Sequence, residues 1–332
     1  MRYTPASGTE EIKRAFSLAL ERDHGLVYAP EQIAVTSGTK LMLYALLNVL
    51  TDPGDKVLIP APFYTSYYHA ARLAGTVPVV IPCGRDTGYR LTEDLLETYA
   101  KRGASVLILN NPCNPSGVVY TREELTAFAK LCEKYDLWVV TDEIYGALTY
   151  TEMPFVPFAS VGDDAFGRTV TVNGVSKAYA MTGWRIGCAA GPVEVIKPLK
   201  AMLSHTAGSP NTAAQTAAAA ALREGNACPK RIQESFRRRR DIAVRELSGI
   251  NGLTFPYPEG AFYIMPDISP WLSPRVPDDG AFALGLLREK GVAVVPCADY
   301  GAPGCIRIAF TASEDELVAG LQGLKEFLAE QN

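Results

Sequence analysis

The sequence predicts an α/β fold, with a mostly parallel seven-stranded sheet sandwiched by helices and a smaller C-terminal α+β domain. Short, apolar, β-branched runs recur along the chain, and segments with helical periodicity lie between most of them. Such alternation is typical of parallel sheets that are covered on both faces. With 332 residues, 48% of them hydrophobic, the chain can bury the core of one large domain or of two ordinary ones.

The predicted strands are the runs "QIAVTSG", "DKVLIPAP", "TVPVVIP", "SVLILNNP", "LWVVTDE", "RTVTVNG" and "RIGCAAGP". The helical segments between them include Lys40–Leu50, Thr65–Ala74, Arg122–Tyr135 and Val193–Leu203. Only the turn that holds Lys177 separates the last two strands. One antiparallel strand is therefore expected there, because a parallel crossover needs a longer connection.

An alanine-rich helix is predicted from Pro210 to Leu222, and the helical pattern continues to about Leu247. We expect this long helix to join a large domain of residues 1–240 to a small domain of residues 241–332. In the small domain, "LTFPYPEGAFYIMPDI", "GVAVVPCADY" and "CIRIAFTAS" predict strands, and Ser313–Gln331 predicts the closing helix.

Composition argues against several classes of protein. The net charge of −4 gives no general attraction to nucleic acid or to anionic membranes, and the basic run "FRRRRD" is expected to form a solvated or interdomain helix face. The seven cysteines lack CxxC spacing, which favours a reducing cytoplasm over a disulfide framework, and the three histidines form no HExxH motif that would indicate a metal site. With neither a membrane-length apolar run nor a signal-peptide pattern, the sequence predicts a soluble, cytoplasmic protein.

Polar and aromatic residues follow the predicted strands, where ligands gather in open α/β sheets. After "IAVT" come Ser37 to Lys40, and the free N–H groups of the helix that begins there could hold a phosphate. The glycine spacing of a Walker or dinucleotide loop is absent, so this loop alone is a weak indication.

Three further strand ends carry candidate residues. Tyr64 could cover a flat cofactor, or it could only pack under a loop. The rigid turn "NNPCNPSG" could direct the amide of Asn114 into the cleft. Asp142 ends a buried strand, where a carboxylate needs a cationic partner unless it caps a helix.

The stretch "TVNGVSKAYAMTGWRIG" places Lys177 in a tight turn and Arg185 eight positions later. Burial and a neighbouring cation lower the pKa of a lysine and make it a usable nucleophile and base. The guanidinium of Arg185 suits a phosphate. Arg307 lies inside the apolar run "CIRIAF", where it needs either a substrate carboxylate or an internal salt bridge.

Taken together, these residues resemble the class I/II aminotransferases of the fold-type I pyridoxal-phosphate (PLP) superfamily, and in particular the aspartate aminotransferases. The segment "GVSKAYAMTGWRIG" carries the resemblance most clearly, and the similarity runs from about Tyr3 to the C-terminus. It implies that Lys177 forms the aldimine with PLP and that Arg185 and Ser176 contact the cofactor. The family often has a serine where this sequence has Gly174, so one hydroxyl contact to the phosphate is absent.

The resemblance assigns the remaining site residues to the two ends of the cofactor and to the substrate. Phosphate binding falls to the amides of Gly38, Thr39 and Lys40. Ring binding falls to Tyr64 by stacking, to Asp142 at the pyridine nitrogen, and to Asn114 and Tyr145 at the phenolic oxygen. Substrate binding falls to Arg307, with Asn114 and Lys40. No metal is implied.

The resemblance also implies a homodimer with shared active sites, because Tyr3 matches a tyrosine that reaches the phosphate of the other subunit. The family's usual first several dozen residues, which form an arm to the partner and a segment over the substrate, are not found before Tyr3 in this sequence. The region "SHTAGSPNTAAQ" has no arginine for a distal substrate carboxylate. Lys40 stands where a second branch of the family has a lysine for that purpose, although it could equally be a solvated residue of the first helical turn.

The expected reaction is ping-pong transamination between an L-amino acid and a 2-oxo acid, with 2-oxoglutarate and glutamate as the expected pair. In this mechanism Lys177 moves the proton between the substrate Cα and C4′ of the cofactor. Two alternatives share the same residues. One is another fold-type I PLP enzyme, such as a carbon–sulfur β-lyase or a decarboxylase, and the other is a non-catalytic, effector-sensing PLP domain. The sequence shows no DNA-binding module that the second would accompany.

Overall fold

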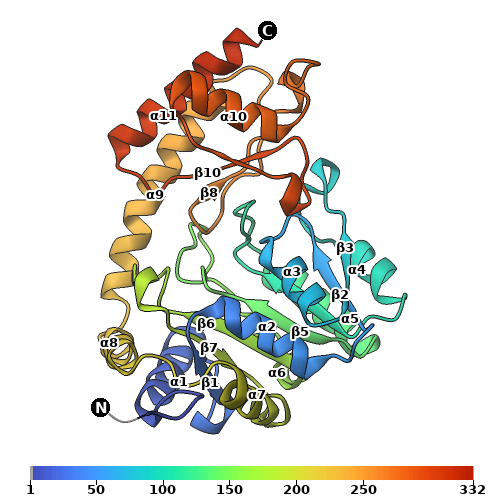
Figure 1. Cartoon of the computed structure of the whole chain (residues 1–332), viewed down its shortest axis with the longest axis vertical. Helices are drawn as coiled ribbons and strands as arrows, with labels where there is room; N and C mark the ends of the chain where they lie inside the picture. Colours follow the sequence, from blue (N-terminus) through green and yellow to red (C-terminus); the bar gives the residue numbers. More distant parts are fainter. Residues whose placement is uncertain (1–2, 332) are drawn as a thin grey trace.

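The computed structural model describes residues 3–331, and its larger part is a seven-stranded sheet in the order β1-β7-β6-β5-β4-β2-β3. Each predicted run forms one strand: β1 Ile33–Thr36, β2 Lys56–Pro60, β3 Val77–Ile81, β4 Val106–Asn110, β5 Trp138–Asp142, β6 Thr169–Gly174 and β7 Gly187–Ala190. This confirms the predicted fold class. Figure 1 shows this sheet in the lower part of the molecule, with helices on both of its faces.

The directions of the strands determine which strand ends meet at the same edge of the sheet. Strands β2 to β6 are parallel, whereas β7 is antiparallel to both of its neighbours, β6 and β1. The predicted antiparallel strand is therefore confirmed. Because β7 reverses direction, β1 runs parallel to β6, and the carboxyl ends of β1, β2, β4, β5 and β6 share one edge.

Helices cover the two faces in separate groups, because side chains alternate along each strand. One face is covered by α2 Thr39–Leu50, α3 Ser66–Leu73 and α7 Val193–Thr206. The opposite face is covered by α4 Glu93–Ala100, α5 Arg122–Lys134 and α6 Asp163–Arg168, and at its β1–β7 end by α1 Glu10–His24 and α8 Thr212–Arg223.

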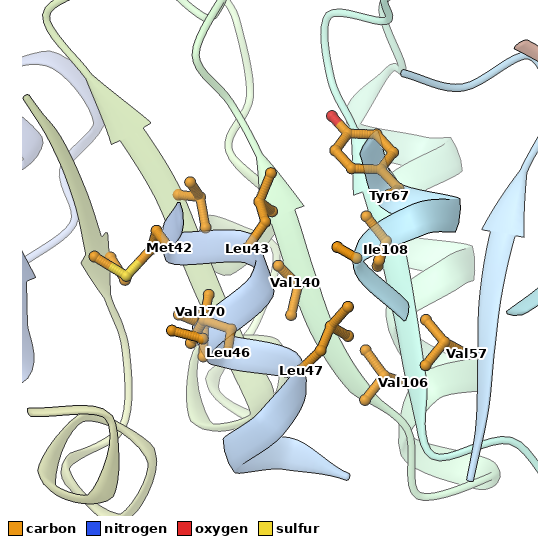
Figure 2. Close-up of a cluster of buried hydrophobic side chains, with 14 of the residues drawn as sticks. Met42, Leu43, Leu46, Leu47, Val57, Tyr67, Val106, Ile108, Val140 and Val170 are labelled. Carbon is orange, nitrogen blue, oxygen red and sulfur yellow. The ribbon is translucent and has the colours of Figure 1, made fainter. Parts of the chain in front are cut away.

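The helix α2 is fixed to the sheet by one apolar stripe. Its Met42, Leu43, Leu46 and Leu47 lie on the valines and isoleucine of the central strands, and all four are almost fully buried (Figure 2). This spacing is that of one helix face. Truncating a buried leucine to alanine typically costs about 2–5 kcal/mol, so this contact holds the N-terminus of α2 firmly at the carboxyl edge of β1.

The predicted continuous helix to Leu247 is wrong in one respect. The structure has two helices, α8 and α9 Ala227–Ser248, separated at Glu224–Asn226. Gly225 lies between them with φ +80°, in the left-handed region that glycine adopts without strain. The helical pattern tolerates a single glycine, which is why the break was not predicted.

The second sheet has three short antiparallel strands in the order β8-β10-β9, namely β8 Tyr263–Ile264, β10 Ile306–Ala309 and β9 Val295–Pro296. The helices α10 Asp279–Lys290 and α11 Glu314–Glu330 pack with it. The first predicted strand run is mostly irregular. Its Pro256 and Pro258 cannot donate to a ladder, and Thr254 reaches Asp267 only through an isolated bridge.

The arginines of "FRRRRD" lie on α9, which runs from the large sheet to the small one (Figure 1). Arg237 donates to the Tyr150 carbonyl and Arg239 to the Thr311 carbonyl. Arg240 is only 6% exposed, and its guanidinium lies over the ring of Tyr150. The basic run therefore lies on a helix, as predicted, and three of its arginines contact other segments of the chain.

Within residues 3–331, no helix combines the length and the apolar character that crossing a membrane requires. In the same range, no group of three or more His, Cys, Asp or Glu side chains is arranged to hold a metal ion. All seven cysteines are free, and six of them are buried.

Candidate active site

A cleft of about 280 Å³ opens at the carboxyl edge of the large sheet, below the small sheet. All of the predicted site residues except Tyr3 and Gly38 line it. Its lining is Thr39, Lys40, Tyr64, Tyr67, Asn110, Asn114, Asp142, Ile144, Tyr145, Ser176, Lys177, Thr182, Arg185, Tyr263, Tyr300 and Arg307. Residues from many separate segments of the chain therefore converge on one cleft.

Lys177 lies in the turn after β6 and is half-buried. Its Nζ is 5.3 Å from the ring centroid of Phe262 and 5.9 Å from that of Tyr145. Burial lowers the pKa of this lysine, while the negative charge of Asp142 acts in the opposite direction. A lowered pKa increases the fraction of neutral amine, which is the nucleophilic form.

Asp142 ends β5 and is 4% exposed. Its Oδ2 accepts a hydrogen bond from the Tyr67 hydroxyl at 2.8 Å, and its Oδ1 accepts one from the Ile144 amide at 3.2 Å. Neither donor is charged, so burial dominates and raises the pKa of Asp142 to about 6. This carboxylate does not cap a helix, and a cation placed in the cleft would stabilise its ionised form.

The start of α2 and Arg185 form an anion-binding end of the cleft. No side chain caps the first amides of α2, which begins at Thr39 after Gly38. The guanidinium of Arg185 lies directly against Gly38, so a Cβ at position 38 would displace it. A Cβ on Gly187 would lie 2.6 Å from the Thr39 nitrogen, so β7 can approach this loop only as glycine. Free amides beside a guanidinium fit a phosphate group.

Arg307, on β10, enters the cleft from the small sheet. Its Nη1 donates to Asn114 Oδ1 at 2.9 Å, and its guanidinium carbon is 4.5 Å from the ring centroid of Tyr263 and 5.1 Å from that of Tyr300. Its Nε is buried and has no hydrogen-bond partner among the described residues. Arg307 is thus paired with a neutral amide rather than with a carboxylate. Its unpaired Nε–H suits a substrate carboxylate.

The orientation of Asn114 follows from this contact. A guanidinium only donates, so Asn114 must present its oxygen to Arg307 and its amino group elsewhere in the cleft. Asn110 fixes the backbone of the loop after β4 that carries Asn114. Its Oδ1 accepts from the backbone amide of Asn114 at 2.7 Å, and its Nδ2 donates to the Asp142 carbonyl at 2.8 Å.

Tyr64 and Lys40 form the outer wall of the cleft. The Nζ of Lys40 lies 5.5 Å from the ring centroid of Tyr64. The ring of Tyr64 meets that of Tyr67 edge-on, with centroids 5.6 Å apart. Lys40 is exposed, so its charge is available to a ligand at the mouth of the cleft.

Tyr3 is fully exposed and lies outside the cleft of its own chain. Its predicted contact is with the phosphate of a partner subunit, which a single chain does not test.

Several cleft residues were not predicted from the sequence: Tyr67, Asn110, Tyr263 and Tyr300. Tyr67 lies one helical turn after Tyr64, which is the only local indication of its place. Tyr263 follows "EGAF" in a run that reads as an ordinary apolar strand. The roles of Tyr67 and Tyr263 depend on partners distant in sequence, which no local pattern reveals.

Known proteins match this chain over nearly its whole length. A family model described as "Aminotransferase class I and II" matches residues 1–324. The aspartate/prephenate aminotransferase of Cereibacter sphaeroides is 40% identical, over 99% of this chain and 84% of that protein. The aspartate aminotransferase of Bacillus subtilis is 35% identical, over 98% of this chain and 84% of that protein.

The chain belongs to the class I and II aminotransferases. Solved structures agree with this assignment. The crystal structure of the aspartate aminotransferase from Rhizobium meliloti superposes with a TM-score of 0.94 at 36% identity, over 99% of this chain and 84% of that one. The aromatic aminotransferase from Pyrococcus horikoshii gives a TM-score of 0.94 at 32% identity, over 99% and 88%.

This aminotransferase depends on PLP, as its family does. The cleft fits that cofactor on its own evidence, because it combines uncapped amides and Arg185, a buried carboxylate without a charged donor, and a lysine with a lowered pKa. The relatives are named as aminotransferases, which favours amino-group transfer over the β-lyase, decarboxylase and effector-sensing alternatives.

Proposed function

We propose that this aminotransferase transfers the amino group of an acidic L-amino acid, aspartate first, to 2-oxoglutarate, and that it acts in the cytoplasm as a homodimer. The observation that carries the substrate proposal is that the lining of the cleft holds two cations besides Lys177 and Arg185, namely Arg307 and Lys40. A dicarboxylic substrate presents two carboxylates, and each can meet one cation. Names of relatives that include aspartate or prephenate support this choice.

In the proposed site, Arg185 and the amides of Gly38, Thr39 and Lys40 hold the phosphate, and Ser176 adds a contact. Tyr64 covers the ring, and Asp142, held by Tyr67, pairs with the pyridine nitrogen. When bound, PLP supplies an electron sink for the electrons released at the substrate Cα. The role of Asp142 is to keep the pyridine nitrogen protonated, and a cationic nitrogen in return favours the carboxylate form.

Lys177 would hold the cofactor covalently, and its free amine would serve as the base for the proton of the substrate Cα. Its lowered pKa supports this role, because the base must be neutral when it accepts the proton. The amino group of Asn114 and the hydroxyl of Tyr145 would donate to the phenolic oxygen of the cofactor. Arg307 binds the α-carboxylate, and its free Nε supports that assignment.

We also propose a division into residues 1–240 and 241–332. A separate apolar cluster supports it, in which α10, α11 and the end of α9 pack with the strands β8 and β10. The helix α9 then belongs to both parts.

The first test is the visible absorption spectrum of the purified chain with PLP. Addition of aspartate should bleach the band of the lysine-bound cofactor, and 2-oxoglutarate should restore it. Lys177→Ala should lose both the covalent attachment and turnover. A band that no amino acid changes would contradict amino-group transfer.

The substrate proposal is tested with Lys40→Ala. Loss of one exposed ion pair should raise KM for aspartate by up to about fivefold and leave KM for phenylalanine unchanged, since phenylalanine has no distal carboxylate. Lys200→Ala, a surface change on α7, is the control. An equal effect on both substrates would contradict the role of Lys40.

A further inference from the structure

Two buried phenols meet in the wall of the cleft. The hydroxyl oxygens of Tyr145 and Tyr263 are 2.9 Å apart, and the side chains are only 4% and 6% exposed. Tyr145 comes from the turn after β5 of the large sheet, whereas Tyr263 begins β8 of the small sheet. This hydrogen bond therefore joins the two sheets at the active site.

The same Tyr263 also touches the carboxylate-binding residue. The guanidinium carbon of Arg307 is 4.5 Å from the centroid of the Tyr263 ring. At that distance the ring attracts the cation, and the attraction is larger in a site shielded from water. One side chain thus uses its hydroxyl on Tyr145 and its ring on Arg307.

A bound cofactor would decide which of the two hydroxyls donates the hydrogen bond. If Tyr145 donates its proton to the phenolic oxygen of the cofactor, its own oxygen is left to accept, and Tyr263 is the donor at 2.9 Å. A hydroxyl that accepts one hydrogen bond donates a stronger one, because the two bonds polarise each other.

We propose that Tyr263 is a positioning residue with two separable functions: its hydroxyl donates to Tyr145 and strengthens the hydrogen bond from Tyr145 to the cofactor, and its ring holds Arg307 at the carboxylate site. The proposal rests on the roles given to Tyr145 and Arg307 in the proposed function.

Other charged and titratable groups affect the pKa values of Tyr145 and Tyr263, so a test of the two hydroxyls must leave these groups unchanged. Asp142 and Arg307 face Tyr145, and Arg307 and the hydroxyl of Tyr64 face Tyr263. Lys177 is in turn affected by Tyr64, Asp142, Arg185 and Arg307. Replacing tyrosine by phenylalanine changes none of these groups, so a spectroscopic shift reports the lost hydroxyl.

The experiment is a pH titration of the visible absorbance of the PLP-loaded protein, for the wild type, Tyr145→Phe, Tyr263→Phe and the double variant. A hydrogen bond to the phenolic oxygen favours its ionised form and lowers the proton affinity of the nitrogen that links Lys177 to the cofactor. Tyr145→Phe should raise the spectroscopic pKa most. Tyr263→Phe should raise it by about 0.5 unit, which is a roughly threefold change in proton binding. The double variant should match Tyr145→Phe, because the hydroxyl of Tyr263 acts through Tyr145.

Tyr120→Phe is the matched control. Tyr120 is also a buried phenol in a hydrogen bond, since its hydroxyl accepts from the Leu91 amide at 3.0 Å, but it does not line the cleft. Its variant should lose thermal stability without a spectroscopic shift. A shift in Tyr145→Phe but none in Tyr263→Phe would overturn this inference and leave the proposed function intact. No shift in Tyr145→Phe would instead contradict the proposed role of Tyr145.

The ring function is tested by the dissociation constant of an unreactive dicarboxylate, succinate. Tyr263→Phe keeps the ring and should bind succinate as the wild type does. Tyr263→Leu should bind it roughly three- to thirtyfold more weakly, because the cation–π contact is gone. Equal binding by the two variants would overturn the ring function, and the titration of the phenylalanine variant decides the hydroxyl function even if the leucine variant fails to fold.

Discussion

Glu143 is a fully buried carboxyl group that directly follows Asp142. Its Oε1 accepts a hydrogen bond from the Phe158 amide at 3.0 Å, whereas its Oε2 has no partner among the described residues. Burial raises its pKa to about 8, and the neighbouring Asp142 adds to the effect. Near neutral pH the folded protein therefore holds a proton on Glu143 that the unfolded chain releases.

Replacing this residue tests that difference. Between the ordinary pKa of a glutamate and about 8, the folded state binds more protons than the unfolded state, so stability falls as the pH rises, by at most roughly 1.4 kcal/mol per unit. Glu143→Gln is neutral throughout and keeps an acceptor for Phe158. Its Tm should therefore fall less than that of the wild type between pH 5 and pH 8 in thermal unfolding. Parallel curves would show that Glu143 is ionised in the fold.

Tyr67 is the one side-chain donor to Asp142 among the described hydrogen bonds. In Tyr67→Phe the buried carboxylate loses that donor, its pKa rises further, and it becomes protonated at a higher pH. We expect kcat/KM to fall about tenfold, which corresponds to one hydrogen bond to a charged group, and the acid limb of its pH profile to move upward. Tyr28→Phe removes another buried hydroxyl, one that has no partner among the described residues, and should leave the profile unchanged. An acid limb at an unchanged pH would show that Tyr67 does not affect the ionisation of Asp142.

At this scale the sequence predicts residues whose reason is local. Lys177 and Asp142 stand at the ends of recognisable strands, and Arg185 stands at a fixed distance from Lys177. Tyr67 and Tyr263 have partners far away along the chain, so their roles arise only when elements meet in space. The sequence likewise left open whether Arg307 forms an internal salt bridge or binds a substrate carboxylate. The answer depends on the side chain that faces it, which is the neutral Asn114.

Among the elements, the contact between β7 and the start of α2 has the least tolerance. Because a Cβ at position 187 would lie 2.6 Å from the Thr39 nitrogen, Gly187→Ala should displace the anion-binding loop, residues 37–38 between β1 and α2 together with the first amides of α2. We expect the Kd for PLP, measured by fluorescence quenching, to rise at least tenfold.

The matched control for this change is Gly183→Ala. Gly183 lies in the short turn Thr182–Trp184 that leads into β7, and an added Cβ there would meet nothing within 4 Å. Its Kd for PLP should stay within a factor of two of the wild-type value. Similar weakening in both variants would mean that the turn, and not the close approach of Gly187, controls phosphate binding.

Elements were predictable where apolar periodicity decides them and not where a single backbone feature does. All seven strands of the large sheet lie within the apolar runs that predicted them, and most of these strands contain β-branched residues. The break between α8 and α9 depends on the conformation of Gly225, and the short strands of the small sheet depend on prolines and on partners that lie elsewhere in the chain. The pattern of hydrophobic residues carries no information on either.

For the whole molecule, the exposed Tyr3 allows a test of the proposed dimer, because it is the residue predicted to reach the cleft of a partner subunit. In sedimentation the protein should behave as a dimer, and Tyr3→Phe should leave the dimer intact. The same variant should raise the Kd for PLP by about tenfold, as expected for the loss of one hydrogen bond to phosphate. Tyr257→Phe alters another exposed tyrosine and should change neither property. A monomer that binds PLP with the affinity of the wild type despite Tyr3→Phe would contradict shared active sites.

The antiparallel β7 also has a consequence for how the molecule is made. In the large sheet β1 is an outer strand whose neighbour is β7, so residues 33–36 have no ladder partner until residues 187–190 have left the ribosome. Pairings between segments so distant along the chain form slowly, and an unpaired strand is prone to associate wrongly. The anion-binding loop between β1 and α2 is therefore among the last parts of the large sheet to take shape, and a nascent chain that ends before β7 should not retain the cofactor.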